Sequence, residues 1–371
     1  MNFDEIELLE RFVDLLKTKK TFEKYAFQTI DFSNIGEEFK KCDFKECLFF
    51  GCMFPEGQIE RLWKNNYVFP AFDLPFNVYP SRLYDASVLY EKYETGKPET
   101  YTETYDYQVY QHFMKYGKEE APIKIALAQR IHDHGITDAL YDFLSGYEEK
   151  KVVAIMGGHG IRRDSDAYKK VALLSKKLCE LGYLMISGGG PGSMEAAHLG
   201  VWFAGKDDDE LTNALLLLKR APDFKHQLWL DVAMEVMYKY PRNKKYESLG
   251  IPTWYFGHEP ATPFASKIAK YFANSVREDG LLTIAKGGII FTPGSAGTMQ
   301  EIFQEATQNH YKIFGYASPM IFYGKDYWEN EVPVIPFFKN LITKGKYQNL
   351  LLSCFDSDYE IIDELSKFSK I

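Results

Sequence analysis

The sequence predicts an α/β protein with a doubly wound, Rossmann-like parallel sheet and an additional N-terminal mixed α+β module. From residue 151 onward, short apolar runs that end in glycine alternate with helical stretches, which is typical of βαβ units. The first 150 residues are rich in aromatic side chains and contain a five-residue repeat. A chain of 371 residues is long enough for two domains. We therefore expect an accessory module over residues 1–148 and the Rossmann-like domain over 149–371.

Composition and charge exclude several classes of protein. The charged fraction of 26% is that of a globular chain and argues against a disordered or fibrous one. The net charge of −8 provides no general attraction to phosphate backbones, so we expect no nucleic-acid partner. No apolar stretch approaches 18 uncharged residues, so we expect no membrane association. The opening MNFDEIELLERFVDLL is acidic and lacks the basic and apolar regions of a signal peptide, which predicts a cytoplasmic protein.

The predicted N-terminal module begins with an amphipathic helix over residues 3–19, followed by the stretch FKKCDFKECLFFGCMF. There Phe39, Phe44, Phe49 and Phe54 recur every five positions, a period that fits neither helix nor strand. The pattern resembles a pentapeptide-repeat coil, in which every fifth side chain points into a narrow solenoid. One coil is too short to stand alone, so we expect it to dock on the rest of the protein.

Cys42, Cys47 and Cys52 follow the same five-residue period. Two Cys-x4-Cys steps lie at the edge of zinc spacing, but a fourth ligand would have to come from far away. Packing is therefore favoured over a metal site, since free cysteine often serves as a small buried residue. The odd total of five cysteines indicates reduced thiols.

The remaining elements follow in order along the chain. Residues 60–125 are rich in Tyr and Pro, which suggests an irregular connection that leads into a helix near 105–118. A second helix is expected at 122–145. The charged run YEEKK at 147–151 is the expected domain boundary. The expected strands of the sheet are KVVAIM, YLMIS, IPTWYF (251–256), GGIIFT (288–292) and PMIFY (319–323). The expected helices between them cover 165–181, 192–204, 263–277, a stretch from 297, and 335–343. The aromatic region 224–256 is either a lid or base-stacking wall, or helix core.

Three of the predicted strands end in glycine-rich loops. These loops contain Gly157, Gly158, His159 and Gly160; Gly188, Gly189, Gly190, Pro191 and Gly192; and Pro293, Gly294, Ser295, Ala296, Gly297 and Thr298. Ligands of such sheets bind beyond the carboxyl ends of the strands, and bare backbone amides at helix N-termini favour anions. A single glycine loop is equally well explained as a tight turn. Three loops at one sheet edge favour a phosphate pocket.

Other nucleotide-binding motifs fit less well. The sequence contains no G-x-x-x-x-G-K-[ST], which argues against a P-loop NTPase. The first strand is followed by GGHG rather than G-x-G-x-x-G, so a mononucleotide is favoured over an adenine dinucleotide.

The segments SGGGPGSMEAA (187–197) and TPGSAGTMQE (292–301) resemble the two signatures of the LOG family of Rossmann-type nucleotide-binding proteins. Its best-known members are cytokinin-nucleotide phosphoribohydrolases, and many bacterial members were once mislabelled lysine decarboxylases. The family pattern is GGG-x-x-G-x-M and, about a hundred residues on, PGG-x-GT-x-x-E, with an arginine about fifteen residues before the second motif. Arg277 matches that arginine, and Met194 matches the methionine of the first motif. The resemblance covers residues 150–325 and also implies a homodimer.

Two positions depart from the family pattern. Ser295 replaces the second glycine of PGG and adds a hydroxyl donor to the loop. Gln300 stands where the family often has a first acid after the threonine, so Glu301 is the remaining one. This departure puts the family's usual substrate in doubt.

The chemistry expected at these positions is cleavage of an N-glycosidic bond. A carboxylate at Glu301 would reach the ribose of a bound nucleotide and stabilise its developing positive charge or position water. Arg277 would clamp phosphate or assist departure of the base, and Glu195 would hold ribose hydroxyls. Each of these side chains could instead serve only as a partner of a helix dipole. His159 is a candidate phosphate contact, whereas the adjacent pair Arg162 and Arg163 is better explained as solvated charge.

Two functions follow from this reading. The first is a hydrolase that converts a nucleoside 5′-monophosphate to free base and ribose 5-phosphate without a metal or redox cofactor. The alternative is a catalytically silent nucleotide-binding sensor or scaffold, whose N-terminal module contacts a partner. A decarboxylase is disfavoured, because no lysine lies in a recognisable pyridoxal-phosphate context.

Overall fold

The structure, a computed structural model, describes residues 3–370 and divides into two compact units. The first unit contains the residues up to Leu83 together with Met114–Tyr141, and the second contains Tyr84–Phe113 together with the residues from Asp142 onward. The segment Tyr84–Phe113, hereafter the insert, therefore belongs with the second unit rather than with the module expected to end at residue 148. Its first residue shows why: the backbone of Tyr84 exchanges two hydrogen bonds with that of Ile268, at 2.9 and 2.7 Å.

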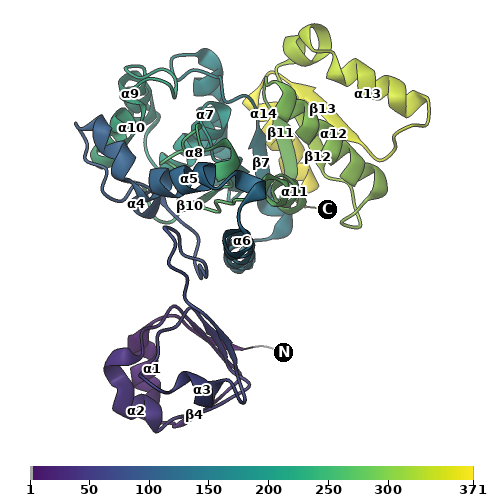
Figure 1. Ribbon diagram of the computed structural model, residues 1–371. Helices are drawn as coiled ribbons and strands as arrows, with labels where there is room; N and C mark the ends of the chain where they lie inside the picture. Colours follow the sequence, from purple (N-terminus) through teal and green to yellow (C-terminus); the bar gives the residue numbers. More distant parts are fainter. Residues whose placement is uncertain (1–2, 371) are drawn as a thin grey trace. The chain divides into compact units, whose positions relative to one another are not determined.

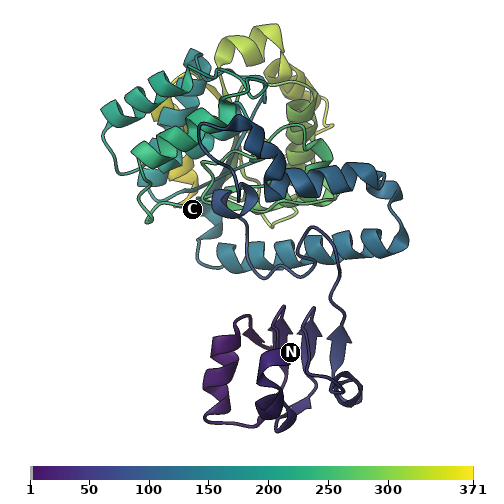
Figure 2. The ribbon, with the colours of Figure 1, turned by 60° about the vertical axis from the view of Figure 1, so that its left-hand side comes forward.

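The N-terminal part of the first unit is a small coil of short parallel strands and helices (Figure 2). Its strands are β1 (Asp4–Ile6), β2 (Thr21–Glu23), β3 (Tyr25–Gln28), β4 (Asp43–Lys45), β5 (Leu48–Phe50) and β6 (Tyr67–Phe69), and its short helices are α1 (Leu9–Leu16), α2 (Gly36–Lys40) and α3 (Ile59–Leu62). The expected helix over 3–19 is wrong in its first part. Residues 4–6 pair with β3 instead, and helix begins only at Leu9.

The five-residue period does form the expected pentapeptide-like coil, and the coil makes more than one turn. β2 pairs in parallel with β4, and β3 pairs in parallel with β5. Phenyl rings of successive turns therefore stack, with centroids 5.5 Å apart for Phe22 and Phe44 and 4.9 Å apart for Phe27 and Phe49. All four rings are buried, so the repeat forms the apolar core of this coil.

The cysteines of the repeat are part of that core. The thiols of Cys47 and Cys52 donate hydrogen bonds to the carbonyl oxygens of Phe22 and Phe27, at 3.3 and 3.4 Å. Burial raises the pKa of the Cys52 thiol to about 12, which leaves it protonated and unreactive at neutral pH. Among the side chains that the structure describes, no group of three or more His, Cys, Asp or Glu is arranged to hold a metal ion.

Two helices follow the irregular connection, as predicted: α5 (Tyr105–Lys115) and α6 (Ile123–Leu144). A short helix, α4 (Ala86–Leu89), precedes them in the insert and is capped by Asp85, whose carboxylate accepts hydrogen bonds from the amides of Ser87 and Val88. In the part of the chain that the structure describes, no helix combines the length and hydropathy needed to cross a bilayer.

The second unit contains a seven-stranded parallel sheet in the order β10-β9-β8-β7-β11-β12-β13, flanked by helices (Figure 1). The strands are β7 (Val152–Met156), β8 (Leu184–Ser187), β9 (Ser248–Gly250), β10 (Lys267–Ile268), β11 (Gly288–Phe291), β12 (Pro319–Tyr323) and β13 (Leu351–Phe355). The helices are α7 (Asp166–Glu180), α8 (Ser193–Trp202), α9 (Asp208–Leu218), α10 (Trp229–Lys239), α11 (Asn274–Ile284), α12 (Ala296–Tyr311), α13 (Val334–Thr343) and α14 (Asp358–Phe368). The fold is Rossmann-like.

The strand order places a topological switch point between β7 and β11. From β7 the chain winds outward through β8, β9 and β10, then returns to the other side of β7 and continues through β11, β12 and β13. The loops that follow β7 and β11 therefore diverge to opposite faces of the sheet and leave a crevice between them. In open α/β sheets this crevice is where ligands bind.

Two predicted elements between residues 248 and 277 are wrong. The expected strand 251–256 is displaced to β9, and the expected helix 263–277 is replaced by the short strand β10 and a helix that begins only at Asn274. Polar side chains explain the difference. Ser266 accepts a hydrogen bond from the amide of Ser248 (2.8 Å) and donates one to its carbonyl (2.9 Å), which fixes residues 266–268 beside β9 in extended form.

Candidate functional site

The three glycine loops meet at the carboxyl ends of β7, β8 and β11, as the sequence predicts. We refer to them as loop 1 (Gly157–Gly160), loop 2 (Gly188–Gly192) and loop 3 (Pro293–Thr298). The amide of Gly158 donates to the carbonyl of Pro293 (3.1 Å), which joins loops 1 and 3. The amide of Ser193, directly after loop 2, donates to the carbonyl of Gly158 (3.2 Å), which joins loop 1 to the end of loop 2.

Close packing of the loops explains several of their glycines. A Cβ on Gly157 would lie 1.8 Å from the hydroxyl of Thr292, and a Cβ on Gly192 would lie 2.5 Å from the carbonyl oxygen of Gly158. Gly192 also has a φ of +70°, a conformation that other residues rarely adopt. These positions therefore need glycine so that the three backbones can approach each other.

Loop 2 is buried and supports its neighbours, and its backbone amides are not open to a ligand. Gly188, Gly189 and Gly190 are all buried, and the amide of Gly189 donates to the hydroxyl of Ser187 (3.0 Å). The side chain of Met194 packs against the loop: a Cβ added to Gly188 would lie only 2.7 Å from the methionine sulfur. Packing therefore accounts for the methionine of the first motif.

Loop 3 is the most open of the three. Ser295, Ala296 and Gly297 are exposed, and α12 starts within them. The first amides of a helix lack intrahelical acceptors and favour an anion. Thr298 is buried, and the hydroxyl of Tyr327 donates to the carbonyl of Gly294 (2.6 Å), which fixes the loop from outside. Loop 3 thus presents free backbone donors at the switch point.

Glu301 lies one turn into α12, the helix that begins in loop 3. Its side chain is partly buried, and among the described residues its carboxylate forms no hydrogen bond, although the charge of Arg277 acts on it. Burial raises its pKa to about 7, an effect that the charge of Glu278 reinforces and the charge of Arg277 opposes. A carboxyl group that titrates near neutrality at the end of a parallel sheet is a candidate acid or base.

Arg277 lies in the first turn of α11 and reaches loop 2. Its guanidinium nitrogen Nη1 is 3.8 Å from the place a Cβ on Gly188 would occupy. Nη2 donates to Oδ1 of Asn274 (2.9 Å) and forms an ion pair with Glu278 (3.4 Å), while Gln300 donates to the second oxygen of Glu278 (2.9 Å). These bonds orient the guanidinium at the edge of the crevice.

Glu195 does not face the crevice, in contrast to the expectation that it holds ribose hydroxyls. Its side chain is 0% exposed and forms a bidentate ion pair with Arg163, at 2.5 and 2.9 Å. The hydroxyl of Tyr168 donates to the same carboxylate (2.9 Å). Arg163 is likewise buried, so the expected solvated pair is wrong for this residue, whereas Arg162 is exposed beside Asp164. The sequence shows charge at 163 and 195 but not that the two charges neutralise each other.

His159 lies exposed on loop 1 and connects the loops to a neighbouring segment. Its Nδ1 is 3.3 Å from a carboxylate oxygen of Glu259, and its ring meets that of Phe224 edge-on, with centroids 5.9 Å apart. The other oxygen of Glu259 is 3.9 Å from the position of a Cβ on Gly190. Glu259 is a member of this cluster that sequence reasoning missed, because GHEP matches no motif.

No family model matches the sequence, and no curated protein matches it. Several solved structures are similar to part of it. The molybdenum cofactor binding protein from the phototrophic bacterium Rippkaea orientalis aligns over 59% of this chain and 96% of its own, with 12% identity and a TM-score of 0.35. The Moco carrier protein from Chlamydomonas reinhardtii aligns over 59% and 98%, with 14% identity and a TM-score of 0.37. The structural-genomics target TM1055 aligns over 58% and 98%, with 18% identity and a TM-score of 0.38. At these values the similarities carry no information about function.

Proposed function

We propose that the loops bind the 5′-phosphate of a nucleoside monophosphate and that the protein hydrolyses its N-glycosidic bond to free base and ribose 5-phosphate. The observation that carries the proposal is the partly buried carboxylate of Glu301, which lies one turn after the exposed start of α12 and close enough to Arg277 for the two charges to interact. A phosphate on the amides of loop 3 places the ribose over the first turns of α12. The resemblance of loops 2 and 3 to the LOG signatures supports the same assignment.

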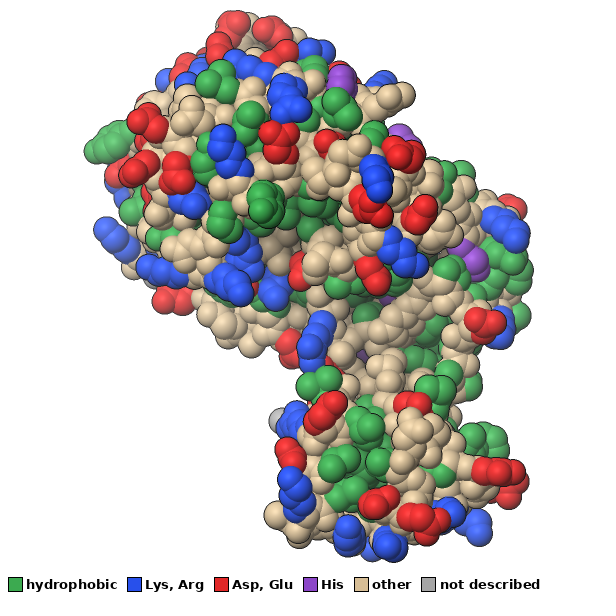
Figure 3. All heavy atoms as spheres, turned by 90° about the vertical axis from the view of Figure 1, so that its left-hand side faces the viewer, with side chains coloured by type: hydrophobic (Ala, Val, Ile, Leu, Met, Phe, Trp, Pro, Cys, Tyr) green, Lys and Arg blue, Asp and Glu red, His purple; other side chains and the backbone are tan. Residues whose placement is uncertain are grey.

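The phosphate contacts would come mainly from loop 3. The first amides of α12 and the hydroxyl of Ser295 are exposed donors, and the helix dipole adds favourable potential for a dianion. His159 on loop 1 would provide a further donor. Loop 2 would act from below by fixing loop 1, in keeping with its burial. On the face drawn in Figure 3, acidic and basic side chains are interspersed, consistent with a local phosphate site rather than a broad basic surface.

The reaction would proceed through an oxocarbenium-like ribose. The bond between C1′ and the base nitrogen breaks with its electron pair on the base, while a water oxygen bonds to C1′. Ionised Glu301 would stabilise the positive charge and accept a proton from the water, and the base nitrogen would take up a proton from solvent or from an acidic group. Arg277 would orient the substrate through a charge-assisted hydrogen bond. Glu195 has no role in this scheme other than holding α8.

The test is release of base from AMP and other nucleoside monophosphates, followed by chromatography. Glu301→Gln should abolish release while binding of AMP is retained, because glutamine keeps the size of the side chain but not its charge. Glu305→Gln is the matched control: the same residue type lies four positions on in α12, but its carboxylate is buried and accepts a hydrogen bond from Ser318 (2.6 Å). Hydrolysis by Glu301→Gln at the wild-type rate would exclude the assigned role.

A second candidate is a nucleotide-binding sensor that lacks turnover. The observation that favours it is Gln300, whose amide is bound to Glu278 where related motifs often have an additional acid. It predicts tight AMP binding, no released base, and an AMP-dependent change in sedimentation. The homodimer implied by the family resemblance is measured in the same experiment.

A further inference from the structure

A pocket of about 570 Å³ lies in the second unit beside the loops. Aromatic side chains dominate its lining: Tyr101, Tyr107 and Tyr110 come from the insert, Phe224 comes from the segment before α10, and Trp229 is the first residue of that helix. Its volume is within the range of about 300–1,000 Å³ typical of small-molecule sites. The proposed hydrolysis at Glu301 does not by itself require a pocket of this size or composition.

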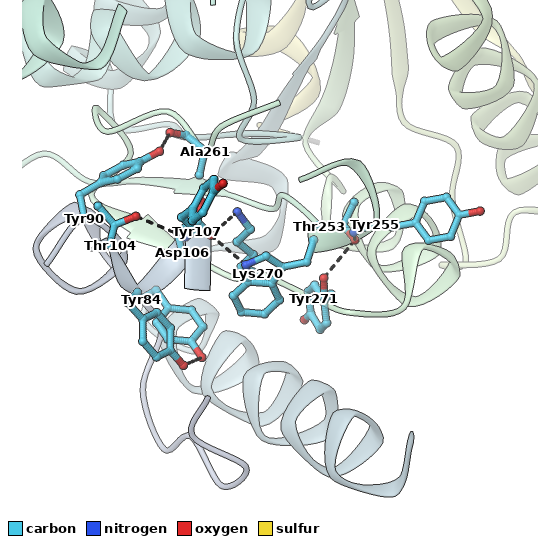
Figure 4. A network of polar contacts seen from close by, with 12 residues as sticks. Tyr84, Tyr90, Thr104, Asp106, Tyr107, Thr253, Tyr255, Ala261, Lys270 and Tyr271 are labelled. Carbon is cyan, nitrogen blue, oxygen red and sulfur yellow. Dashed lines mark hydrogen bonds and ion pairs between the residues drawn. The ribbon is translucent and has the colours of Figure 1, made fainter. Parts of the chain in front are cut away.

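The insert that builds this pocket is fixed to the sheet by a buried polar network (Figure 4). The carboxylate of Asp106 forms an ion pair with Lys270 (2.6 Å) and accepts a hydrogen bond from the indole of Trp254 (2.8 Å). Asp106 is 2% exposed and Lys270 0%. The hydroxyl of Tyr90 also donates to the carbonyl of Ala261. Because separating a buried ion pair leaves an uncompensated charge, the tyrosines of the insert form a fixed wall.

The pocket and the loop site are neighbours. Phe224, which lines the pocket, contacts the ring of His159 on loop 1. Glu259 lies between two pocket residues, His258 and Pro260, and its carboxylate reaches both His159 and loop 2. A single ligand held by the loops can therefore extend into the pocket.

We propose that this pocket binds the heteroaromatic base of the nucleotide, with the insert providing the wall on which the base stacks. This inference rests on the proposed function, because it takes the phosphate to be held by the loops. Aromatic side chains such as Tyr107 and Phe224 offer flat apolar faces to a flat ring. Glu99, His226 and His258 add polar groups that can bond to ring nitrogens and exocyclic groups. A base combines these two properties, whereas a sugar phosphate has no flat face.

The test compares ligands with and without a base. Calorimetry measures the binding of AMP and of ribose 5-phosphate to the full chain carrying Glu301→Gln, which prevents turnover during the titration. AMP should bind more tightly than ribose 5-phosphate. Adding Tyr107→Ala should weaken AMP binding by about 5- to 150-fold, the effect typical of losing one stacking partner, and leave ribose 5-phosphate binding unchanged. Tyr107→Phe, which keeps the ring, should retain AMP binding and shows that the tyrosine acts through its face.

The outcomes separate this inference from the proposed function. Equal affinities for AMP and ribose 5-phosphate would overturn the base pocket while leaving the phosphate site in place. Equal weakening of both ligands by Tyr107→Ala would also overturn it, because the side chain would then act only on the fold. If neither ligand binds, the phosphate site fails and the base pocket with it.

Discussion

Replacing Glu301 by glutamine should remove a pH-dependent loss of stability. Burial moves the pKa of this carboxyl from its ordinary value of 4.5 to about 7. Between these values the folded protein keeps a proton that the unfolded chain has released. The stabilisation by the neutral form is therefore complete below pH 4.5 and is lost as the pH rises through 7. At about 1.4 kcal/mol per pH unit, ionisation costs the fold up to about 3.5 kcal/mol at pH 8.5.

Glutamine does not titrate, so the variant avoids this cost. The free energy of unfolding of Glu301→Gln, relative to wild type, should increase by up to about 3 kcal/mol between pH 5 and pH 8.5. Urea titrations followed by tryptophan fluorescence suit the measurement, because four of the five tryptophans lie in the second unit. Glu331→Gln, at an exposed acid of the same unit, is the control and should show no such trend. If the difference in the free energy of unfolding between Glu301→Gln and wild type does not change with pH, the Glu301 carboxyl does not hold a proton in the folded protein.

Three further predictions concern the rest of the chain. Arg163→Met leaves the charge of Glu195 unpaired in the interior and should lower the free energy of unfolding, measured by urea titration, by about 3–5 kcal/mol. Replacing Glu195 by leucine as well should recover most of this loss. If the double variant recovers nothing, the ion pair does not explain the loss. Gly192→Ala should lower the free energy of unfolding by at least about 1–3 kcal/mol and weaken AMP binding. Gly280 lies inside helix α11, where no atom beyond the helix's own backbone is within 4 Å of an added Cβ, and Gly280→Ala should raise the free energy of unfolding by about 0.5–1 kcal/mol in the same titration. Phe49→Ala should destabilise the first unit by about 3–5 kcal/mol in calorimetry. AMP binding should persist wherever the second unit stays folded, because the proposed site lies in that unit. Loss of AMP binding under those conditions would show that the site depends on the first unit.

The parts of this protein that could be predicted from sequence are those with a local signature. Strands that end in glycine, such as β7 and β8, combine apolar runs with an abrupt change of composition, and three of them were enough to predict the meeting of the loops. The five-residue phenylalanine period is equally local. Phe22, Phe27 and Phe32 follow it too, one turn before Phe44 and Phe49, and would have revealed a second turn.

The predictions from sequence fail where tertiary contacts determine the local structure. Residues 4–6 have helical spacing but gain backbone hydrogen bonds from β3, and residues 266–268 are drawn into the sheet by serine side chains. The burial of Glu195 depends on Arg163, 32 positions away, and the placement of the insert depends on Asp106 meeting Lys270 across 164 positions. No local pattern encodes such pairings, so charged residues that neutralise each other in the interior look like surface residues in the sequence.

The stacked phenylalanines of the first unit restrict how its length can change. Partners in adjacent strands, such as Ala26 and Leu48, are one full circuit of the chain apart. Inserting a single residue would turn every later side chain of that circuit from the interior to the solvent. Adding or deleting a whole circuit would keep each ring above another ring. We therefore expect functional length variants of this unit to differ by complete circuits.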